Sequence, residues 1–154
     1  MYRVLIAEDE VFVRLGLKMS VEWEKMDMRV IADAANGQQA WDIYEKEHPD
    51  IILTDIRMPV MDGMELIRRI RERDRETRIV ILSCLEEFQL VREAISMGVS
   101  DYILKLTMTP EDMEKILQKV RTELESIRGS RKEQGEVSPE EKKRVLLDFF
   151  YYDS

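Results

Sequence analysis

Residues 50–63 read Asp-Ile-Ile-Leu-Thr-Asp-Ile-Arg-Met-Pro-Val-Met-Asp-Gly. The apolar and β-branched run from Ile51 to Thr54 is short and is followed by turn-forming residues, as expected of a strand buried on both faces in a parallel sheet. Asp55 therefore falls where this strand ends, at the carboxyl edge of the sheet, where open α/β folds bind their ligands. On this stretch alone a turn-capping role for Asp55 is equally consistent, so the remaining strands decide between the two interpretations.

Short apolar runs recur along the chain, and each precedes a segment with helical periodicity. The predicted strands are residues 4–7, 30–34, 51–54, 79–82 and 102–104, and the predicted helices begin near residues 11, 39, 64, 88 and 110. Val11, Leu15 and Met19 mark the first helix by their spacing. A hydroxyl, a proline and two acids at residues 109–112 start the last helix, which is expected to end near Arg128. Five β–α units predict an α/β fold with a five-stranded, parallel, doubly wound sheet.

The pattern changes after the last predicted helix. Residues 129–137 are polar, contain two glycines and lack apolar periodicity, which is typical of a linker. Ser138 and Glu141 are then spaced as a capping box, and the apolar segment 145–152 predicts an extra C-terminal helical segment that must pack on this domain, a second copy or a following domain. The predicted organisation is a domain at 1–128, a linker at 129–137, and the start of a helical linker or following domain at 138–154.

Composition excludes several classes of protein. The chain has 154 residues and a net charge of −8, so it is a poor nucleic-acid binder by itself. Its single cysteine, Cys84, excludes an internal disulfide framework and is consistent with a reducing compartment. No apolar stretch approaches the ~20 residues that a membrane span needs. We therefore expect a soluble, cytoplasmic protein that does not contact a membrane.

Reactive side chains follow four of the five predicted strands. Glu8 and Asp9 come directly after the first strand, Asp55 after the third, Ser83 after the fourth and Lys105 after the fifth. The carboxyl ends of parallel strands lie on one edge of the sheet, so these side chains are predicted to converge. Each has an ordinary structural explanation by itself, but their joint occurrence favours a functional site.

The residue types indicate the chemistry of this predicted site. Crowded carboxylates repel one another, and a hard divalent cation with oxygen ligands, best Mg²⁺, relieves the repulsion. Lys105 supplies a point charge for phosphate-like oxygens, and Ser83 supplies a hydroxyl donor. The set therefore predicts a site for a phosphoryl group. Asp55 stands alone at its strand end and is the candidate nucleophile, since an aspartate can carry a phosphoryl group covalently.

From about Val4 to Arg128 the chain resembles the receiver domains of two-component response regulators. The resemblance rests on the acidic pair after the first strand, the segment Asp-Ile-Arg-Met-Pro-Val-Met-Asp-Gly that begins at Asp55, and on Ser83 and Lys105 at their spacings. It implies a flavodoxin-like (βα)5 fold. It also implies that Asp55 accepts a phosphoryl group from a sensor histidine kinase in a Mg²⁺-dependent reaction.

The same resemblance implies a role for each residue of the metal and phosphoryl site. Asp9 and Asp55 would bind Mg²⁺ together with the backbone carbonyl of Arg57, and Glu8 would act through a water molecule. Lys105 would contact the phosphoryl group.

A conformational switch is also implied. Ser83 would move toward the phosphoryl group, and Tyr102, three residues before Lys105, would turn inward. This would couple the site to the face formed by the fourth helix, fifth strand and fifth helix, by a shift of a pre-existing equilibrium. Part of the apolar series in the last helix could serve as a dimer seam, so a homodimer formed on phosphorylation is a further expectation.

The chain departs from the usual receiver pattern at two positions near the site. Leu106 stands where most receivers have a proline, and Cys84 follows Ser83 where the residue is usually smaller; we expect Cys84 to be buried as a small apolar residue. The features beyond Lys105 look similar to receivers that precede an AraC-type output domain. No basic recognition helix occurs in these residues, so DNA would be bound only by an output domain outside this chain.

Two alternatives stay open at this point. A Mg²⁺-dependent phosphatase acting through an aspartyl-phosphate would need a second acid–base group near the nucleophile, and Arg57, two residues after Asp55, cannot serve. A pseudo-receiver that binds partners without being phosphorylated is disfavoured because the whole set is present: Asp9, Asp55, Ser83 and Lys105. A phosphorylation-controlled signalling domain, rather than an enzyme, is the favoured interpretation.

Overall fold

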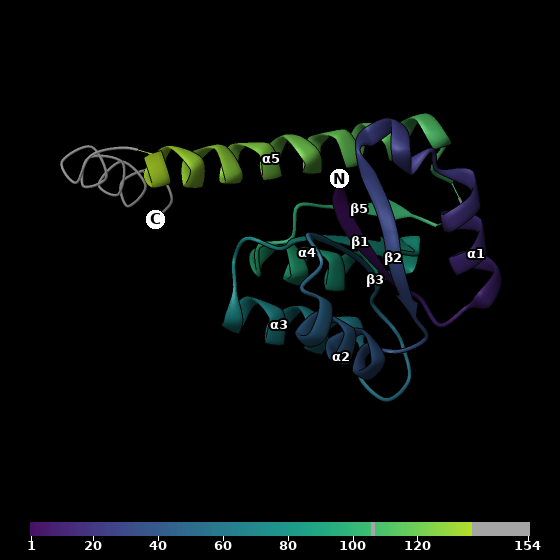
Figure 1. Ribbon diagram of the computed structural model, residues 1–154. Coiled ribbons are helices and arrows are strands. Elements are labelled where there is room, and N and C mark those ends of the chain that lie inside the picture. The colour runs from purple at the N-terminus through teal and green to yellow at the C-terminus, as the bar shows by residue number, and fades with distance from the viewer. Residues whose placement is uncertain (106, 137–154) are drawn as a thin grey trace. The chain divides into compact units, whose positions relative to one another are not determined.

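The computed structural model describes residues 1–105 and 107–136 and has the predicted alternation of strands and helices (Figure 1). Five parallel strands form one sheet in the order β2-β1-β3-β4-β5. The strands are β1 (Tyr2–Ala7), β2 (Met28–Ala34), β3 (Ile51–Asp55), β4 (Arg78–Ser83) and β5 (Asp101–Leu104); the helices are α1 (Val11–Ser20), α2 (Gly37–Glu47), α3 (Gly63–Arg73), α4 (Phe88–Ser96) and α5 (Pro110–Glu136), with short 3-10 helices η1 (Trp23–Met26) and η2 (Leu85–Glu87). The predicted doubly wound, flavodoxin-like α/β fold is confirmed.

Both faces of the sheet are covered. The chain divides into two compact units, Met1–Val120 and Arg121–Ser154. The sheet and the site described below belong to the first unit. Within it, α2, α3 and α4 lie side by side on one face, and α1 and the first part of α5 lie on the other (Figure 1). All five residues of β3 are buried, which explains why its sequence is an unbroken apolar run rather than an alternating one.

The strand order reverses its direction at β1. β1 pairs with β2 on one side and with β3 on the other, so the chain leaves β1 in one direction and later strands are added in the other. At such a switch point the loops that follow the two neighbouring strands separate, and ligands bind between them. The loops concerned follow β1 and β3, and they carry the acidic pair and Asp55.

Helix α1 exposes most of its apolar residues. The spacing of Val11, Leu15 and Met19 correctly predicted a helix, but these side chains lie on its solvent side. Phe12 and Met19 are 89% and 84% exposed, whereas Leu17 is the residue of this helix that is buried. The result is an exposed apolar strip on the helix that follows the acidic pair.

Helix α5 continues past its predicted end at Arg128 as far as Glu136. Each of the two glycines in this stretch costs only about 1 kcal/mol in a helix, and the arginine, lysine, glutamate and glutamine residues between them are good helix formers. A lack of apolar periodicity therefore did not end the helix. The proposed roles of residues 129–137 as a linker and of 138–154 as the start of a further segment stay predictions, and residues 138–154 lie outside the described part of the chain.

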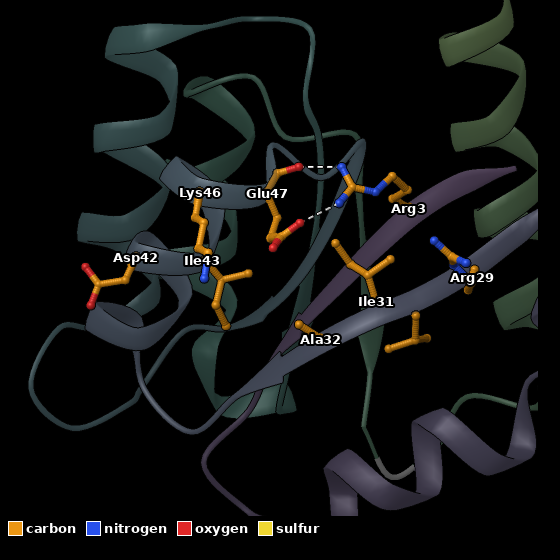
Figure 2. Close-up of a pocket in the computed structure, with 9 residues that line it drawn as sticks. Arg3, Arg29, Ile31, Ala32, Asp42, Ile43, Lys46 and Glu47 are labelled. Atoms are coloured by element: carbon orange, nitrogen blue, oxygen red, sulfur yellow. Dashed lines mark hydrogen bonds and ion pairs between the residues drawn. The ribbon is translucent and has the colours of Figure 1, made fainter.

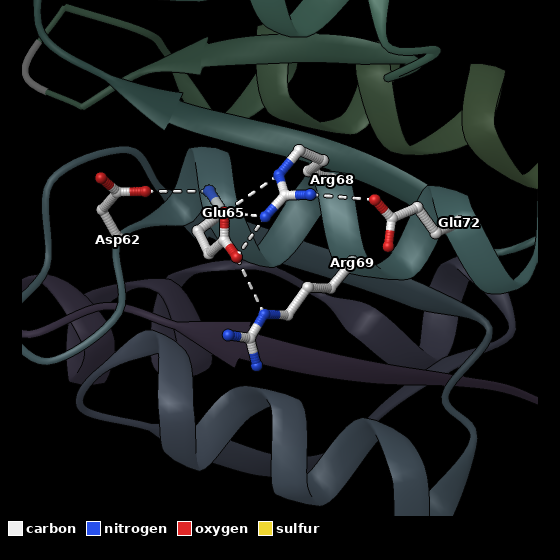
Figure 3. A network of polar contacts seen from close by, with 5 residues as sticks. All are labelled: Asp62, Glu65, Arg68, Arg69 and Glu72. Carbon is white, nitrogen blue, oxygen red and sulfur yellow. Dashed lines mark hydrogen bonds and ion pairs between the residues drawn. The ribbon is translucent and has the colours of Figure 1, made fainter.

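Charged residues on the outer side of α3 pair with one another (Figure 3). Asp62 caps the helix by accepting the Glu65 N–H at 2.9 Å. The Glu65 carboxylate accepts hydrogen bonds from Arg68 and Arg69, and Arg68 also reaches Glu72 at 2.9 Å. These groups are exposed, so the network supports the helix surface modestly.

Among the described residues, no helix is both long enough and apolar enough to cross a membrane.

Candidate functional site

The sheet register brings the functional strand ends level with one another. Ala7, the last residue of β1, pairs with Thr54 of β3, so the residue after β1 lies beside Asp55. On the other side, the Lys105 N–H donates to the Ser83 carbonyl at 3.0 Å, which places the ends of β4 and β5 together. The predicted convergence of these residues at one edge is therefore observed.

Lys105 is held between two buried carboxylates. Its Nζ lies 2.8 Å from Asp55 Oδ2 and 2.9 Å from Glu8 Oε2. The side chains of Glu8, Asp55 and Lys105 are 0%, 6% and 8% exposed. Buried charges persist in proteins when they are paired, but here one ammonium group faces two carboxylates. The cluster keeps one uncompensated negative charge whenever both carboxylates are ionised.

Asp9 adds a third carboxylate on the solvent side. One carboxylate oxygen from each of Glu8, Asp9 and Asp55 lies within 4.8 Å of the others. Hard oxygen donors at such spacing suit Mg²⁺, which retains several water molecules when bound to proteins. Glu8 is the buried member of the acidic pair and Asp9 the exposed one.

Burial changes the protonation of these groups. It raises the pKa of Glu8 to about 7 despite the contact with Lys105, and the neighbouring charge of Asp55 adds to the effect. Burial also raises the pKa of Asp55. Burial alone would lower the pKa of Lys105, but its hydrogen bonds to Asp55 and Glu8 raise it above the ordinary value. The lysine therefore stays charged, and the proton that is exchanged near neutral pH belongs to Glu8.

A close backbone contact fixes the position of Asp55. The Gly63 N–H donates to the Ile56 carbonyl at 2.8 Å. A Cβ atom at Gly63 would lie 1.9 Å from the carbonyl oxygen of Asp55, so only glycine allows this approach. The Asp62–Gly63 pair, which the sequence marks as a turn, thus places the start of α3 in contact with the backbone of Asp55, the candidate nucleophile.

The same loop contains a strained residue, Val60. Its φ of 69° lies in the left-handed region, which costs a residue with a Cβ roughly 1–2 kcal/mol. The Met61 N–H donates to the Pro59 carbonyl at 2.8 Å, which closes a three-residue turn of the strained type. Val60 is 82% exposed, so packing does not compensate the strain. Strain of this kind persists where the surrounding structure dictates the conformation, often beside functional sites.

Ser83 contributes a hydroxyl without a partner. Its Oγ is buried and has no hydrogen bond among the described residues. Glu8 Oε2, by contrast, lies 2.9 Å from Lys105 Nζ and is paired with it. An unsatisfied buried polar group costs about 1–3 kcal/mol, so the Ser83 oxygen is available to a ligand bound at this edge.

Glu87 is a buried carboxylate that the sequence did not single out. Its Oε1 accepts the Cys84 N–H at 2.8 Å, and its Oε2 lies 3.5 Å from Arg57 Nε. The pKa of Asp55 is raised mainly by burial and is lowered by Lys105. The negative charge of Glu87 makes a smaller contribution that also raises it. The available signal was an acid three residues after Cys84, which is capping-box spacing.

The prediction that Cys84 is buried was wrong, because the chain turns outward into η2 at this residue and exposes it.

Two residues with predicted roles, Tyr102 and Arg57, place their side chains outside this cluster. Tyr102 pairs in register with Ile81 and is 38% exposed. Arg57 directs its guanidinium group to Glu87, and the predicted role of its backbone carbonyl as a metal ligand stays a prediction. Leu106 lies outside the described residues.

A separate cavity of about 540 Å³ lies between β2 and α2 (Figure 2). Beside it, the guanidinium of Arg3 on β1 binds the backbone carbonyl of Glu47, and Arg3 Nη2 lies 2.8 Å from Glu47 Oε2. The lining residues include none of the groups at the carboxyl edge of the sheet. We therefore assign the functional site to the charged cluster rather than to this cavity.

Comparison with known proteins agrees with the site geometry. Residues 4–121 match the family described as the response regulator receiver domain. The chain is 36% identical over 105 residues to the uncharacterized transcriptional regulatory protein YesN of Bacillus subtilis (strain 168), which covers 68% of this chain and 28% of YesN. The chain thus spans less than a third of that regulator's length.

Two solved structures are also similar. The REC domain of AraT, a response regulator from Geobacillus stearothermophilus, superposes with a TM-score of 0.78 at 31% identity and covers 82% of this chain and 98% of that chain. A two component transcriptional regulator AraC from Clostridium phytofermentans ISDg gives a TM-score of 0.72 at 26% identity and covers 84% and 98%. The similarity extends over nearly the whole of each solved chain.

In metal-free buffer, Glu8→Gln is expected to be more stable than the wild type at pH 8 and about equally stable near pH 4, below both pKa values. The folded-state pKa of Glu8, about 7, exceeds its ordinary value of 4.5, so ionised Glu8 destabilises the fold increasingly as the pH rises from 4.5 to 7. One pKa unit corresponds to about 1.4 kcal/mol, and we expect a gain on the order of 1 kcal/mol or more.

The measurement is the free energy of unfolding in denaturant at both pH values, with a chelator present. Glu65→Gln is the control, because Glu65 has a lowered pKa from its hydrogen bonds to Arg68 and Arg69 and should give no such gain. A loss of stability for Glu8→Gln at pH 8 would contradict this account of the cluster.

Proposed function

The chain belongs to the response regulator receiver family, and on this basis we propose that Asp55 accepts a phosphoryl group from a sensor histidine kinase. The observation that carries the proposal is the setting of Asp55. Its carboxylate is buried at the carboxyl edge of the sheet, 2.8 Å from a charged lysine and within a cluster of carboxylates. A nucleophile, a cationic group and a metal-binding set are the parts that phosphoryl transfer needs.

We propose Mg²⁺ as the metal. Glu8, Asp9 and Asp55 would hold it, with the backbone carbonyl of Arg57 as a further ligand. The uncompensated negative charge of the cluster and the spacing of its three carboxylates support this choice. When bound, Mg²⁺ would neutralise charge on the phosphoryl oxygens. Because Glu8 must lose its proton first, Mg²⁺ affinity should fall as the pH decreases below about 7.

In the proposed reaction, a carboxylate oxygen of Asp55 attacks the phosphorus atom of a phosphohistidine. The new O–P bond forms as the N–P bond breaks, and the electron pair of that bond returns to the imidazole nitrogen. Lys105 exchanges one of its contacts with Asp55 or Glu8 for a phosphoryl oxygen and stabilises the charge there. The Ser83 hydroxyl, which has no hydrogen bond among the described residues, supplies one to another phosphoryl oxygen.

The proposed switch begins with this hydroxyl. Movement of Ser83 toward the phosphoryl group would also move the segment that connects Ser83 to α4. Tyr102, which is partly exposed at rest, would turn inward, and the surface formed by α4, β5 and α5 would change. The phosphoryl group can shift this equilibrium only by as much as it favours one state.

An enzymatic role is less well supported than a signalling role. Rapid hydrolysis of an aspartyl-phosphate needs an acid–base group beside the nucleophile. The nearest additional carboxylate identified, Glu87, has one oxygen bound to the Cys84 N–H and the other 3.5 Å from Arg57. Slow loss of the phosphoryl group is therefore expected. A pseudo-receiver stays the principal alternative, and failure to bind Mg²⁺ would favour it.

We propose that the output is control of transcription in the cytoplasm. YesN is described as a transcriptional regulatory protein, and the AraC regulator of Clostridium phytofermentans as a two component transcriptional regulator. DNA would be bound by an output domain beyond the 154 residues of this chain, with a homodimer formed on phosphorylation. The exposed apolar strip of α1, which includes Phe12 and Met19, offers a surface for a protein partner on the helix that follows the acidic pair.

Asp55→Asn should abolish phosphorylation by a small phosphodonor. Wild-type protein incubated with Mg²⁺ and acetyl phosphate is expected to gain the mass of one phosphoryl group, because the Asp55 carboxylate is the nucleophile. Asp62→Asn is the matched control, since Asp62 lies in the same loop and asparagine caps a helix equally well. Intact-mass spectrometry measures the gain. An equal gain by Asp55→Asn would place the acceptor elsewhere.

Ser83→Ala should separate resting stability from phosphorylation. Its Oγ has no partner among the described residues, so the free energy of unfolding should equal or exceed that of the wild type, by up to about 1–3 kcal/mol. The phosphorylated fraction at steady state with acetyl phosphate should nevertheless fall, because the phosphoryl group loses a donor. In the control Ser96→Ala, the lost hydroxyl only donates to the Glu93 carbonyl on an exposed helix. A normal phosphorylated fraction in Ser83→Ala would contradict the proposed contact.

A further inference from the structure

Arg14 of α1 reaches back to the loop that carries the acidic pair. Its Nη1 donates to the backbone carbonyl of Glu8 at 2.7 Å. Its Nε lies 3.4 Å from Oδ1 of Asp33, a residue of β2, and the Arg14 side chain is 16% exposed. One side chain thus connects a helix, an adjacent strand and the backbone of a candidate metal ligand.

Besides the contact of the Glu8 carboxylate with Lys105 at 2.9 Å, the other anchors found for this loop among the described residues are backbone groups and Glu8 itself. The Glu8 N–H donates to the Ala34 carbonyl at 2.9 Å, and Glu8 Oε1 accepts the Glu10 N–H at 3.1 Å. Helix α1 begins without a side-chain cap at Glu10 and without an acid in its first turn. Leu17 is the buried residue of the helix, so apolar packing holds its first turn weakly. The link through Arg14 is therefore important for fixing the position of the loop relative to α1.

We propose that Arg14 is a positioning residue for the acidic pair: by fixing the carbonyl of Glu8 it sets the separation of the Glu8 and Asp9 carboxylates from Asp55. This inference rests on the proposed function of that cluster as a Mg²⁺ site. Arg14 does not ligate the metal or touch the phosphoryl group. It acts through the geometry of the loop, because ligand oxygens must lie close to their ideal positions around a small ion such as Mg²⁺.

Charge and position predict opposite effects when Arg14 is replaced. A guanidinium group repels a divalent cation, so its removal on charge grounds alone would tighten Mg²⁺ binding. Loss of the hydrogen bond to the Glu8 carbonyl would instead loosen the loop and weaken binding. The direction of the change in Mg²⁺ affinity therefore distinguishes the two contributions.

Lys18 provides a matched control on the same helix. Its Nζ lies 2.7 Å from Oδ2 of Asp33, so it shares the ion-pair partner of Arg14. It makes no recorded contact with the loop among the described residues. Replacing Lys18 removes one positive charge and one ion pair to Asp33 but leaves the Glu8 carbonyl bound.

The test is Mg²⁺ affinity measured by calorimetry on the unphosphorylated chain at pH 8, for the wild type, Arg14→Met, Lys18→Met and Arg14→Lys. Methionine keeps the aliphatic packing of the longer side chain. We expect Arg14→Met to bind Mg²⁺ about 3–10-fold more weakly, which corresponds to roughly 0.7–1.4 kcal/mol. Lys18→Met should bind within about twofold of the wild type or more tightly. Arg14→Lys should fall between the wild type and Arg14→Met.

Thermal unfolding of each variant without metal shows whether it is folded, and Arg14→Lys keeps the test valid if Arg14→Met unfolds. The positioning role would be overturned if Arg14→Met bound Mg²⁺ as tightly as the wild type or more tightly, or if Arg14→Lys did so when it alone is folded. It would also be overturned if Lys18→Met weakened binding as much as Arg14→Met does. Absence of Mg²⁺ binding in the wild type would instead overturn the proposed metal site, on which this inference rests.

Discussion

The contact of Lys105 with two buried carboxylates is the interaction on which the rest of the site depends. Nζ lies within 2.9 Å of both Asp55 and Glu8, and all three side chains are almost fully buried. Such a cluster is tolerated only because opposite charges meet there. The meeting requires that β1, β3 and β5 end level with one another, and the parallel register of the sheet provides this.

The imbalance of this cluster links structure to function. One lysine cannot neutralise three carboxylates, so the resting protein holds a negative charge that a divalent cation can compensate. A buried hydroxyl without a partner, at Ser83, lies on the neighbouring strand end. Both features are unfavourable at rest and become favourable when a metal and a phosphoryl group are present. Folding stability is thus partly given up for ligand binding, as is common at functional sites.

Most of the fold and the main site residues could be predicted because they depend on the backbone. Apolar runs locate the strands, and parallel strands bring residues such as Asp55 and Lys105 to one edge whatever their rotamers. The parts that could not be predicted depend on the direction of side chains. The apolar strip of α1 faces solvent, Glu8 rather than Asp9 is the buried acid, and Glu87 turns inward to bind Cys84. The end of α5 was missed because helix propensity outweighed two glycines.

The central claim is that Lys105 serves the phosphoryl group and is not needed to hold the metal. Lys105→Met tests it most directly, by calorimetric Mg²⁺ titration and by the rate of phosphorylation with acetyl phosphate on one preparation. At alkaline pH, where Glu8 stays ionised although the loss of Lys105 raises its pKa, the account predicts Mg²⁺ affinity equal to or higher than that of the wild type, because a competing cation is removed. Phosphorylation should be slowed at least about tenfold. Loss of Mg²⁺ binding by the folded variant, or phosphorylation at the wild-type rate, would contradict it.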